Sequence, residues 1–181
     1  QLLIRLHPTH FLDVADYKAE RERIRSLADS LGHVHLVEPV SLGGEMGHYS
    51  GEDMPEKSSM MAHSDMMVTV YSTMVVEALM HGTPVISLCI DSKEGWQNKF
   101  TLPLTRIGGW PTHRRFRDSN AGVEVTNIDD LKIVLNNYLI NPDADKDARL
   151  AFLDRKCTYL DGSAGKRTAD FFASIINGRD A

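Results

Sequence analysis

The stretch from Ser64 to Leu88, SDMMVTVYSTMVVEALMHGTPVISL, restricts the possible folds of this chain more than any other segment. Residues 66–70 form an apolar run of strand length, and the hydroxyl-bearing Tyr-Ser-Thr triplet at 71–73 interrupts it. Residues 74–81 favour a helix, and a second apolar run follows at 85–90. This order predicts two buried strands joined by a helical crossover.

The crossover is short because Gly82 and Pro84 end the predicted helix. Right-handed crossovers of this kind join parallel strands. We therefore expect Ser72 and Thr73 at the carboxyl edge of a parallel sheet, beside a helix N-terminus. Anionic ligands bind at this edge in open α/β folds, so the sequence predicts a ligand site there.

The rest of the chain continues the alternation of strands and helices. Further strands are expected at 2–6, 34–37 and 122–125, and further helices at 13–31, 55–63, 128–140, 144–159 and 163–177. Residues 7–11 and the Gly-rich segment 41–54 are expected to be loops, and residues 91–121 to be irregular with one short helix near 93–100. The pattern predicts an α/β fold, a Rossmann-like three-layer α/β/α sandwich with a mostly parallel sheet.

Composition indicates one globular domain over residues 1–181, because 42% of the 181 residues are apolar. The net charge of −5 argues against a general nucleic-acid or anionic-membrane surface. No apolar run approaches the roughly 20 residues that span a bilayer, so we expect a soluble, cytoplasmic domain. The chain begins at Gln1 and enters LLIRL, expected to be a buried strand, which suggests a piece of a longer protein.

The sequence offers no motif for a metal site or a disulfide framework. Cys89 lies in an apolar strand and Cys157 in a late helix, so free or buried thiols in a reducing compartment are expected. Two close histidine pairs lack the further ligands that a metal needs: His7/His10 and His33/His35.

Ser72 and Thr73 are the first candidate site residues. Their hydroxyls and the helix amides after them can hold a diphosphate, although either residue can also serve only as a helix N-cap. Glu77 lies one turn along the same helix in an apolar setting. A ribose diol would satisfy its carboxylate, and a salt bridge to a nearby Arg or Lys would do so equally.

Arg5 and His7 follow the first strand and are expected at the same sheet edge. Both side chains suit phosphate oxygens, although a histidine at this place can be an ordinary turn residue.

Nucleophile and cofactor motifs are absent. The chain has no GxSxG, no GxxxxGK[ST] and no GxGxxG after a strand, which disfavours hydrolase, ATPase and dehydrogenase functions. Trp96, Trp110 and Phe116, near Arg114 and Arg115, would suit base stacking or a local core.

Four motifs together resemble the carboxyl-terminal, donor-binding half of a GT-B glycosyltransferase. They are IRLHP at 4–8, SD-hydrophobic-YST-x₃-EA-x₃-G-x-P-V-I at 64–86, Asp91, and DGSAGKR at 161–167. The resemblance extends over nearly the whole chain. It is greatest to bacterial surface-polysaccharide (capsule) enzymes and to CDP-glycerol glycerophosphotransferases.

The resemblance implies roles for particular residues. Ser72 and Thr73 would hold the donor's diphosphate, Glu77 the ribose, and Arg5 and His7 the phosphates or the leaving group. Four further residues are possible additions to this site: Tyr71, Asp91, His113 and Arg114.

The resemblance also implies partners. The donor would be a nucleotide-diphosphate sugar or a CDP-polyol, and no nucleic acid is expected. An amino-terminal domain that binds the acceptor and supplies the catalytic base would be missing here, so this part alone would be inactive. The whole enzyme would associate peripherally with a membrane. No cofactor is expected, and transfer is predicted to be metal-independent because no DxD pair ends a strand; Asp129-Asp130 begins a helix instead.

Two other functions are compatible with the same residues. A nucleotide-sugar 2-epimerase has the same architecture but needs acid and base groups from another domain. A non-catalytic domain would use the sheet edge only to bind a phosphorylated ligand or a protein partner.

Overall fold

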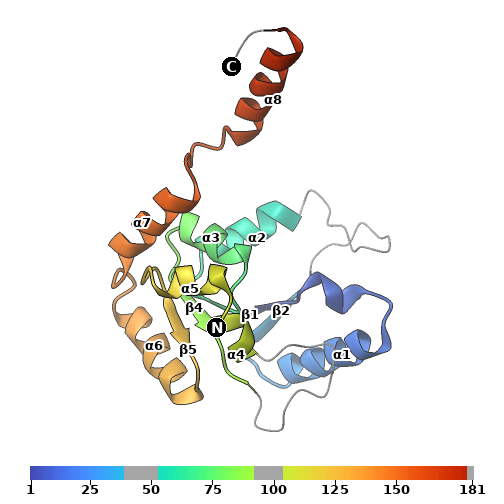
Figure 1. Ribbon diagram of the computed structural model, residues 1–181. Coiled ribbons are helices and arrows are strands. Elements are labelled where there is room, and N and C mark those ends of the chain that lie inside the picture. The colour runs from blue at the N-terminus through green and yellow to red at the C-terminus, as the bar shows by residue number, and fades with distance from the viewer. Residues whose placement is uncertain (39–52, 92–103, 179–181) are drawn as a thin grey trace. The chain divides into compact units, whose positions relative to one another are not determined.

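The structure, a computed structural model, describes residues 1–38, 53–91 and 104–178 (Figure 1). Strands alternate with helices, and every strand pair in this part of the chain is parallel, which confirms the α/β prediction. The chain divides into two compact units, residues 1–59 and 60–181. That residues 1–181 act as a single domain stays a prediction. None of the helices in the described ranges is both long enough and apolar enough to cross a membrane.

The first unit contains a two-stranded parallel sheet. Strand β1 (Leu2–Arg5) pairs with β2 (Val34–Val37) so that Leu2 lies opposite Val34. A 3₁₀ helix (Pro8–Phe11) and α1 (Ala15–Asp29) connect the two strands, and α2 (Asp53–Ala62) follows β2. Two expectations were wrong. Residues 8–11 form a helical turn, and β1 is not buried, because Leu2 and Leu3 are each more than 40% exposed.

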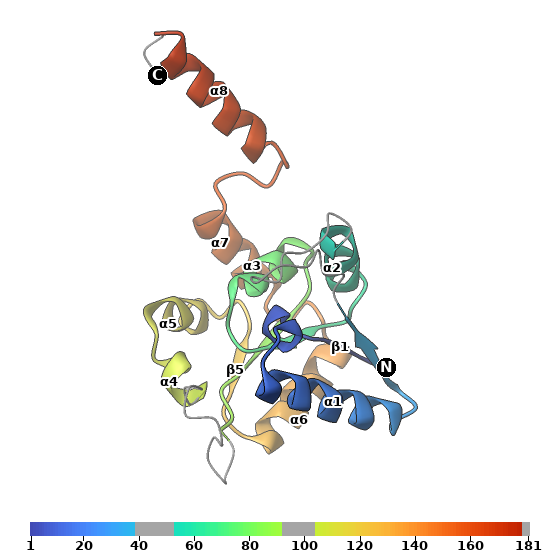
Figure 2. The same ribbon diagram turned by 90° about the vertical axis from the view of Figure 1, so that its right-hand side faces the viewer.

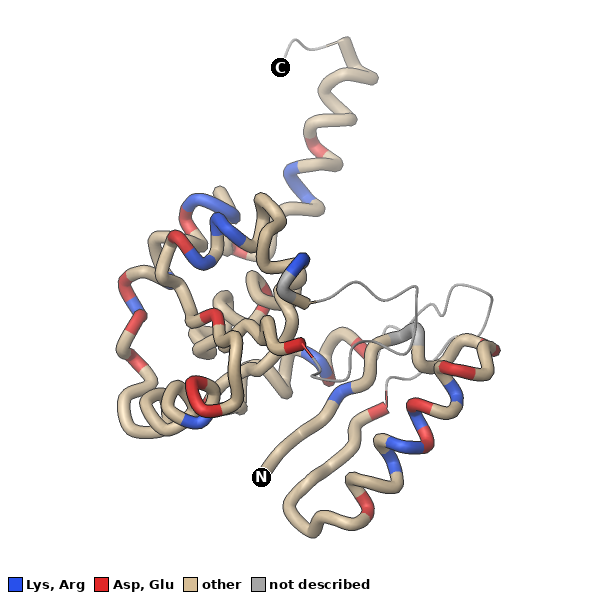
Figure 3. The backbone as a smooth tube through the Cα atoms, turned by 60° about the horizontal axis from the view of Figure 1, so that its bottom comes forward, with Lys and Arg blue, Asp and Glu red and all other residues tan. Residues whose placement is uncertain are grey.

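Ion pairs contribute more than buried apolar side chains to the attachment of helix α1 to its sheet. Acidic and basic residues are interleaved along it (Figure 3), and Ala28 alone among its residues is buried. Its strongest connection is a two-pronged ion pair: Arg25 Nε and Nη2 donate to the two carboxylate oxygens of Glu38 at 2.5 and 2.7 Å. This pair joins the C-terminal part of α1 to the residue after β2.

The second unit is built on a three-stranded parallel sheet in the order β3-β4-β5. The strands are β3 (Met67–Thr69), β4 (Val85–Leu88) and β5 (Val123–Val125). Its helices are α3 (Thr73–Met80), α4 (Leu104–Gly108), α5 (Pro111–Arg117), α6 (Ile128–Ile140), α7 (Lys146–Lys156) and α8 (Ala164–Ile176).

Helices cover both faces of this sheet (Figures 1 and 2). On one face Val85 packs with residues of α3, α5 and α7, among them Val75, Phe116 and Phe152. On the other face Ile86 and Val125 pack against Tyr138 of α6. The strand β4 therefore contributes alternate residues to two cores, as the period of two in a strand requires.

The register places three polar side chains in one row across the sheet. Thr69 of β3 lies opposite Ser87 of β4, and Ser87 lies opposite Glu124 of β5. Partners in a parallel register face the same side, so this polar row belongs to the face that α5 covers.

Arg149 connects the start of α7 to two loops. Its side chain is buried, its Nη2 donates to the Pro142 carbonyl at 2.7 Å, and its Nη1 donates to the Gly82 carbonyl. Its Nε lies 3.0 Å from a carboxylate oxygen of Asp145, which compensates the buried charge.

The region predicted to be irregular contains two helices that the sequence did not indicate, α4 and α5. The helix expected near 93–100, Trp96 and most of the segment 41–54 lie outside the described residues. Phe116 is buried in the core and Trp110 is about half exposed, so these aromatic residues do not share one environment.

Gly122 lies just before β5, where the chain packs closely against β4 and α5. A Cβ at this position would lie 2.5 Å from the Val85 carbonyl oxygen and 2.6 Å from Cζ of Phe116. We expect Gly122→Ala to lower the free energy of unfolding by about 2 kcal/mol or more, measured by urea denaturation. The control is Gly165→Ala in α8, where a Cβ meets nothing within 4 Å, and it should be neutral or slightly stabilising. Equal stability of the two variants would contradict this packing.

Candidate functional site

The Tyr-Ser-Thr turn connects the end of β3 to the start of α3. Ser72 is extended (φ −150°, ψ 179°) and caps α3: its Oγ accepts a hydrogen bond from the Met74 amide at 3.2 Å. The capping role that the sequence allowed is therefore present. Thr73, the first residue of α3, is exposed. Because β3 and β4 are parallel, this turn lies at the carboxyl edge of the sheet, as expected.

Glu77 lies four residues after Thr73 and therefore on the same side of α3. It is half-buried, whereas its neighbours Val75 and Ala78 are fully buried in the core. The carboxylate thus lies at the border between the core and the surface. The N-terminus of α3, which carries a partial positive charge, and the Glu77 carboxylate therefore lie within two turns of the same helix.

Helix α5 packs against the turn through aromatic rings. The rings of Tyr71 and His113 are stacked, with centroids 5.2 Å apart and planes inclined by 20°, and the Phe116 ring lies 5.4 Å from that of Tyr71. Burial raises the pKa of the Tyr71 phenol, and the positive charge of Arg115 acts in the opposite direction. The structure therefore brings Tyr71 and His113 together, and it places a cation near the turn.

Arg114 and Asp91 have different surroundings. Arg114 is exposed on α5. Asp91 follows β4, and its Oδ1 accepts a hydrogen bond from the Leu104 amide at 2.6 Å, which fixes the first residue of α4. This contact gives Asp91 a structural role at a helix start.

Arg5 and His7 belong to the unit 1–59, whereas the turn belongs to the unit 60–181. Arg5 forms ion pairs with the buried Asp53 and, at 2.9 Å, with Glu56 of α2. Burial and the nearby His10 lower the pKa of His7. A phosphate at Arg5 would have to compete with two carboxylates, and a joint site with Ser72 stays a prediction.

A buried polar cluster beneath the turn was not predicted. Ser87 Oγ lies 2.9 Å from Nε2 of His113, and a carboxylate oxygen of Glu124 lies 3.1 Å from the same nitrogen. Cys89 Sγ lies 3.8 Å from Nδ1 of His113. The sequence indicates His113 for the donor site and Cys89 as a free or buried thiol, which the structure confirms for Cys89, but it does not indicate that they lie together with Glu124. The available signal was the alternation of polar residues on apolar strands, at 87 and 89 and again at 124.

Burial dominates the titration of this cluster. It raises the pKa of Cys89 to about 12, with the Glu124 carboxylate acting in the same direction. Burial also lowers the pKa of His113, against the effect of Glu124. An Arg117 Nη1 lies 3.2 Å from the other oxygen of Glu124 and balances its charge.

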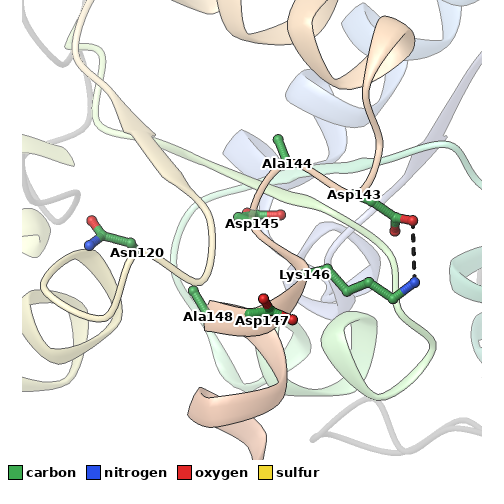
Figure 4. Close-up of a pocket in the computed structure, with 7 residues that line it drawn as sticks. All are labelled: Asn120, Asp143, Ala144, Asp145, Lys146, Asp147 and Ala148. Carbon is green, nitrogen blue, oxygen red and sulfur yellow. Dashed lines mark hydrogen bonds and ion pairs between the residues drawn. The ribbon is translucent and has the colours of Figure 1, made fainter.

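A surface pocket of about 480 Å³ lies elsewhere, at the start of α7 (Figure 4). Asn120 lies opposite the segment 143–148, which contributes three carboxylates, and Lys146 pairs with Asp143 at 3.2 Å. Tyr138 donates to Asp145 at 2.6 Å from below. The excess of negative charge disfavours a diphosphate, so the pocket is a poor donor site despite its size.

No model of a protein family matches this chain, and neither does any curated protein or solved structure. The similarity to GT-B enzymes therefore depends on the motifs in the sequence. The parallel α/β fold is compatible with it.

Two helix caps of the same kind allow the capping role of Ser72 to be measured separately. Asn127 caps α6 by accepting from the Asp130 amide at 2.8 Å, far along the chain from the turn. We expect Ser72→Ala and Asn127→Ala each to lower the free energy of unfolding by about 1 kcal/mol in urea denaturation. A loss at Asn127 with none at Ser72 would contradict the cap at α3.

Proposed function

We propose that this chain is the donor-binding part of a GT-B-type glycosyltransferase or glycerophosphotransferase that uses a nucleotide-diphosphate-activated donor in cell-surface polysaccharide biosynthesis. The observation that carries the proposal is the turn at Ser72, where a parallel strand ends and α3 begins with an exposed threonine. Glu77, one turn further, supplies a half-buried carboxylate. The GT-B family in this proposal comes from the sequence motifs around these residues, which resemble those of GT-B enzymes.

The proposed chemistry is stabilisation of the departing nucleotide, which is a nucleoside diphosphate in sugar transfer and a nucleoside monophosphate in glycerophosphate transfer. The first amides of α3 and the dipole of the helix favour negative charge at its N-terminus. The hydroxyl of Thr73 adds a donor. The cation of Arg115, which lowers the pKa of the neighbouring Tyr71 phenol, adds positive charge near the turn. These groups act on the diphosphate oxygens, and the donor's leaving group gains charge as transfer proceeds.

Glu77 would bind the ribose. A carboxylate offers two acceptor oxygens, which match the two adjacent hydroxyls of the ribose 2′,3′-diol. Its position four residues after Thr73 separates the carboxylate from the diphosphate end of the site by one turn of helix, about 5 to 6 Å. The base and the sugar of the donor are not specified by these residues.

Calorimetric titration of the chain with UDP, CDP, GDP and the matching monophosphates tests the proposal. We expect the diphosphates to bind more tightly, because the helix start offers several donors to the added phosphate. Glu77→Ala and Thr73→Ala should each weaken diphosphate binding by about tenfold, equivalent to about 1.4 kcal/mol. Asn127→Ala, which removes a cap away from the turn, should leave the affinity unchanged.

Several outcomes would count against the proposal. Absence of binding for every nucleotide would reject the donor site, and equal affinity for monophosphates and diphosphates would remove Ser72 and Thr73 from the phosphate role. Turnover of a nucleotide sugar by the whole protein without an acceptor would favour the epimerase. Nucleotide binding without turnover under any condition would favour a non-catalytic domain.

A further inference from the structure

The side chains of Cys89, His113 and Glu124 converge from three elements of the unit 60–181. Cys89 directly follows β4, His113 lies on α5, and Glu124 lies on β5. One possible ligand atom from each residue lies within 4.8 Å of the other two. In a tetrahedral zinc site, sulfur, nitrogen and oxygen ligands lie roughly 3.3 to 3.7 Å apart, as follows from their bond lengths to the metal. Glu124 Oε2 lies 3.1 Å from Nε2 of His113 and Cys89 Sγ lies 3.8 Å from Nδ1, so side-chain shifts of up to about 1 Å would present one atom of each residue to a single ion.

We propose that Cys89, His113 and Glu124 form a binding site for a divalent cation of the zinc type. A thiolate, an imidazole and a carboxylate are all established zinc ligands. The thiolate and imidazole disfavour hard cations such as Mg²⁺, so this site is distinct from any metal that would bind a diphosphate. The inference does not depend on the proposed donor site.

Gly108 provides an independent observation. The position that a Cβ of this residue would occupy lies 3.2 Å from Cys89 Sγ, 3.4 Å from Oε2 of Glu124 and 3.6 Å from Nδ1 of His113. It is thus nearly equidistant from all three donor atoms, and a residue with a side chain would fill it. Glycine leaves room there for a fourth ligand such as water, which completes the coordination of zinc sites with three protein ligands.

Polar groups next to the three residues would orient them. Ser87 Oγ lies 2.9 Å from Nε2 of His113, and the backbone of Ile107 also hydrogen-bonds to the ring. Arg117 Nη1 donates to both carboxylate oxygens of Glu124, at 3.2 and 3.4 Å, while Oε2 also lies 3.1 Å from Nε2 of His113. Such partners orient metal ligands and increase their affinity.

Binding displaces one proton from the thiol of Cys89 to the solvent, so that the thiolate and the Glu124 carboxylate supply two negative charges beside the divalent cation and Arg117. Cys89 and His113 are at most 2% exposed, so these negative charges offset much of the cost of placing a cation in the low dielectric of the interior. The ion would tie α5 to the ends of β4 and β5. Because Tyr71 stacks on His113, it would also support the Tyr-Ser-Thr turn from below.

Cobalt and zinc titrations of the chain, after treatment with a chelator, test this site. We expect about one zinc ion per chain by elemental analysis, a rise in melting temperature with Zn²⁺ and none with Mg²⁺, and a thiolate-to-cobalt absorption band that Zn²⁺ abolishes. Cys89→Ala should remove the band. Cys157→Ala, which removes the other thiol at the end of α7, should retain it.

Glu124→Gln should weaken zinc binding by at least about tenfold, because it replaces an anionic ligand with a neutral one. If Cys89→Ala does not fold, the zinc content and the cobalt spectrum of the unmodified chain still test the proposed site. Substoichiometric zinc together with no cobalt–thiolate band in the unmodified chain would overturn the proposal. A band that disappears in Cys157→Ala and persists in Cys89→Ala would overturn it equally.

Discussion

The central strand β4 is the element on which the larger unit depends. Hydrogen bonds to β3 and β5 hold it on both edges, and Val85, Ile86 and Ser87 are completely buried. Alternate residues of one four-residue strand therefore enter two separate cores, one under α3, α5 and α7 and one under α6. Because β4 is fixed in this way, the end of β3, the start of α3 and the residue after β4 acquire defined positions. The Tyr-Ser-Thr turn and the Cys89 cluster both follow from that constraint.

The Tyr-Ser-Thr turn and the cluster of Cys89, His113 and Glu124 are in direct contact. Tyr71 belongs to the turn and stacks on His113, which belongs to the cluster, so one aromatic contact connects the turn to a buried polar network. The Ser72 cap holds the first turn of the helix in one conformation. A preorganised helix start is the condition for using its dipole on a ligand, because no reorganisation then opposes binding.

The parts that sequence reasoning predicted well are those with a strong local pattern. Strand 34–37 and helix 128–140 were predicted with the bounds that the structure has, because alternation or amphipathic spacing, an Asn cap and a following proline define them locally. Helices α4 and α5 were missed, because they are short and lie among Gly, Pro and Arg residues without periodicity. The cluster was missed for another reason. Cys89, His113 and Glu124 are far apart in the sequence, and only the pairing of β4 with β5 and the packing of α5 bring them together.

The polar row formed by Thr69, Ser87 and Glu124 has a further consequence for how the chain selects its strand pairing. A shift of one residue between β4 and β5 would turn Glu124 toward the α6 face, among Ile86 and Tyr138, and would leave its carboxylate without Arg117 and His113. An apolar residue in this position would tolerate such a shift, whereas a carboxylate makes it costly. The row therefore helps to fix the strand register. A misaligned sheet would bury the Glu124 carboxylate without partners, so its free energy would be higher than that of the native pairing.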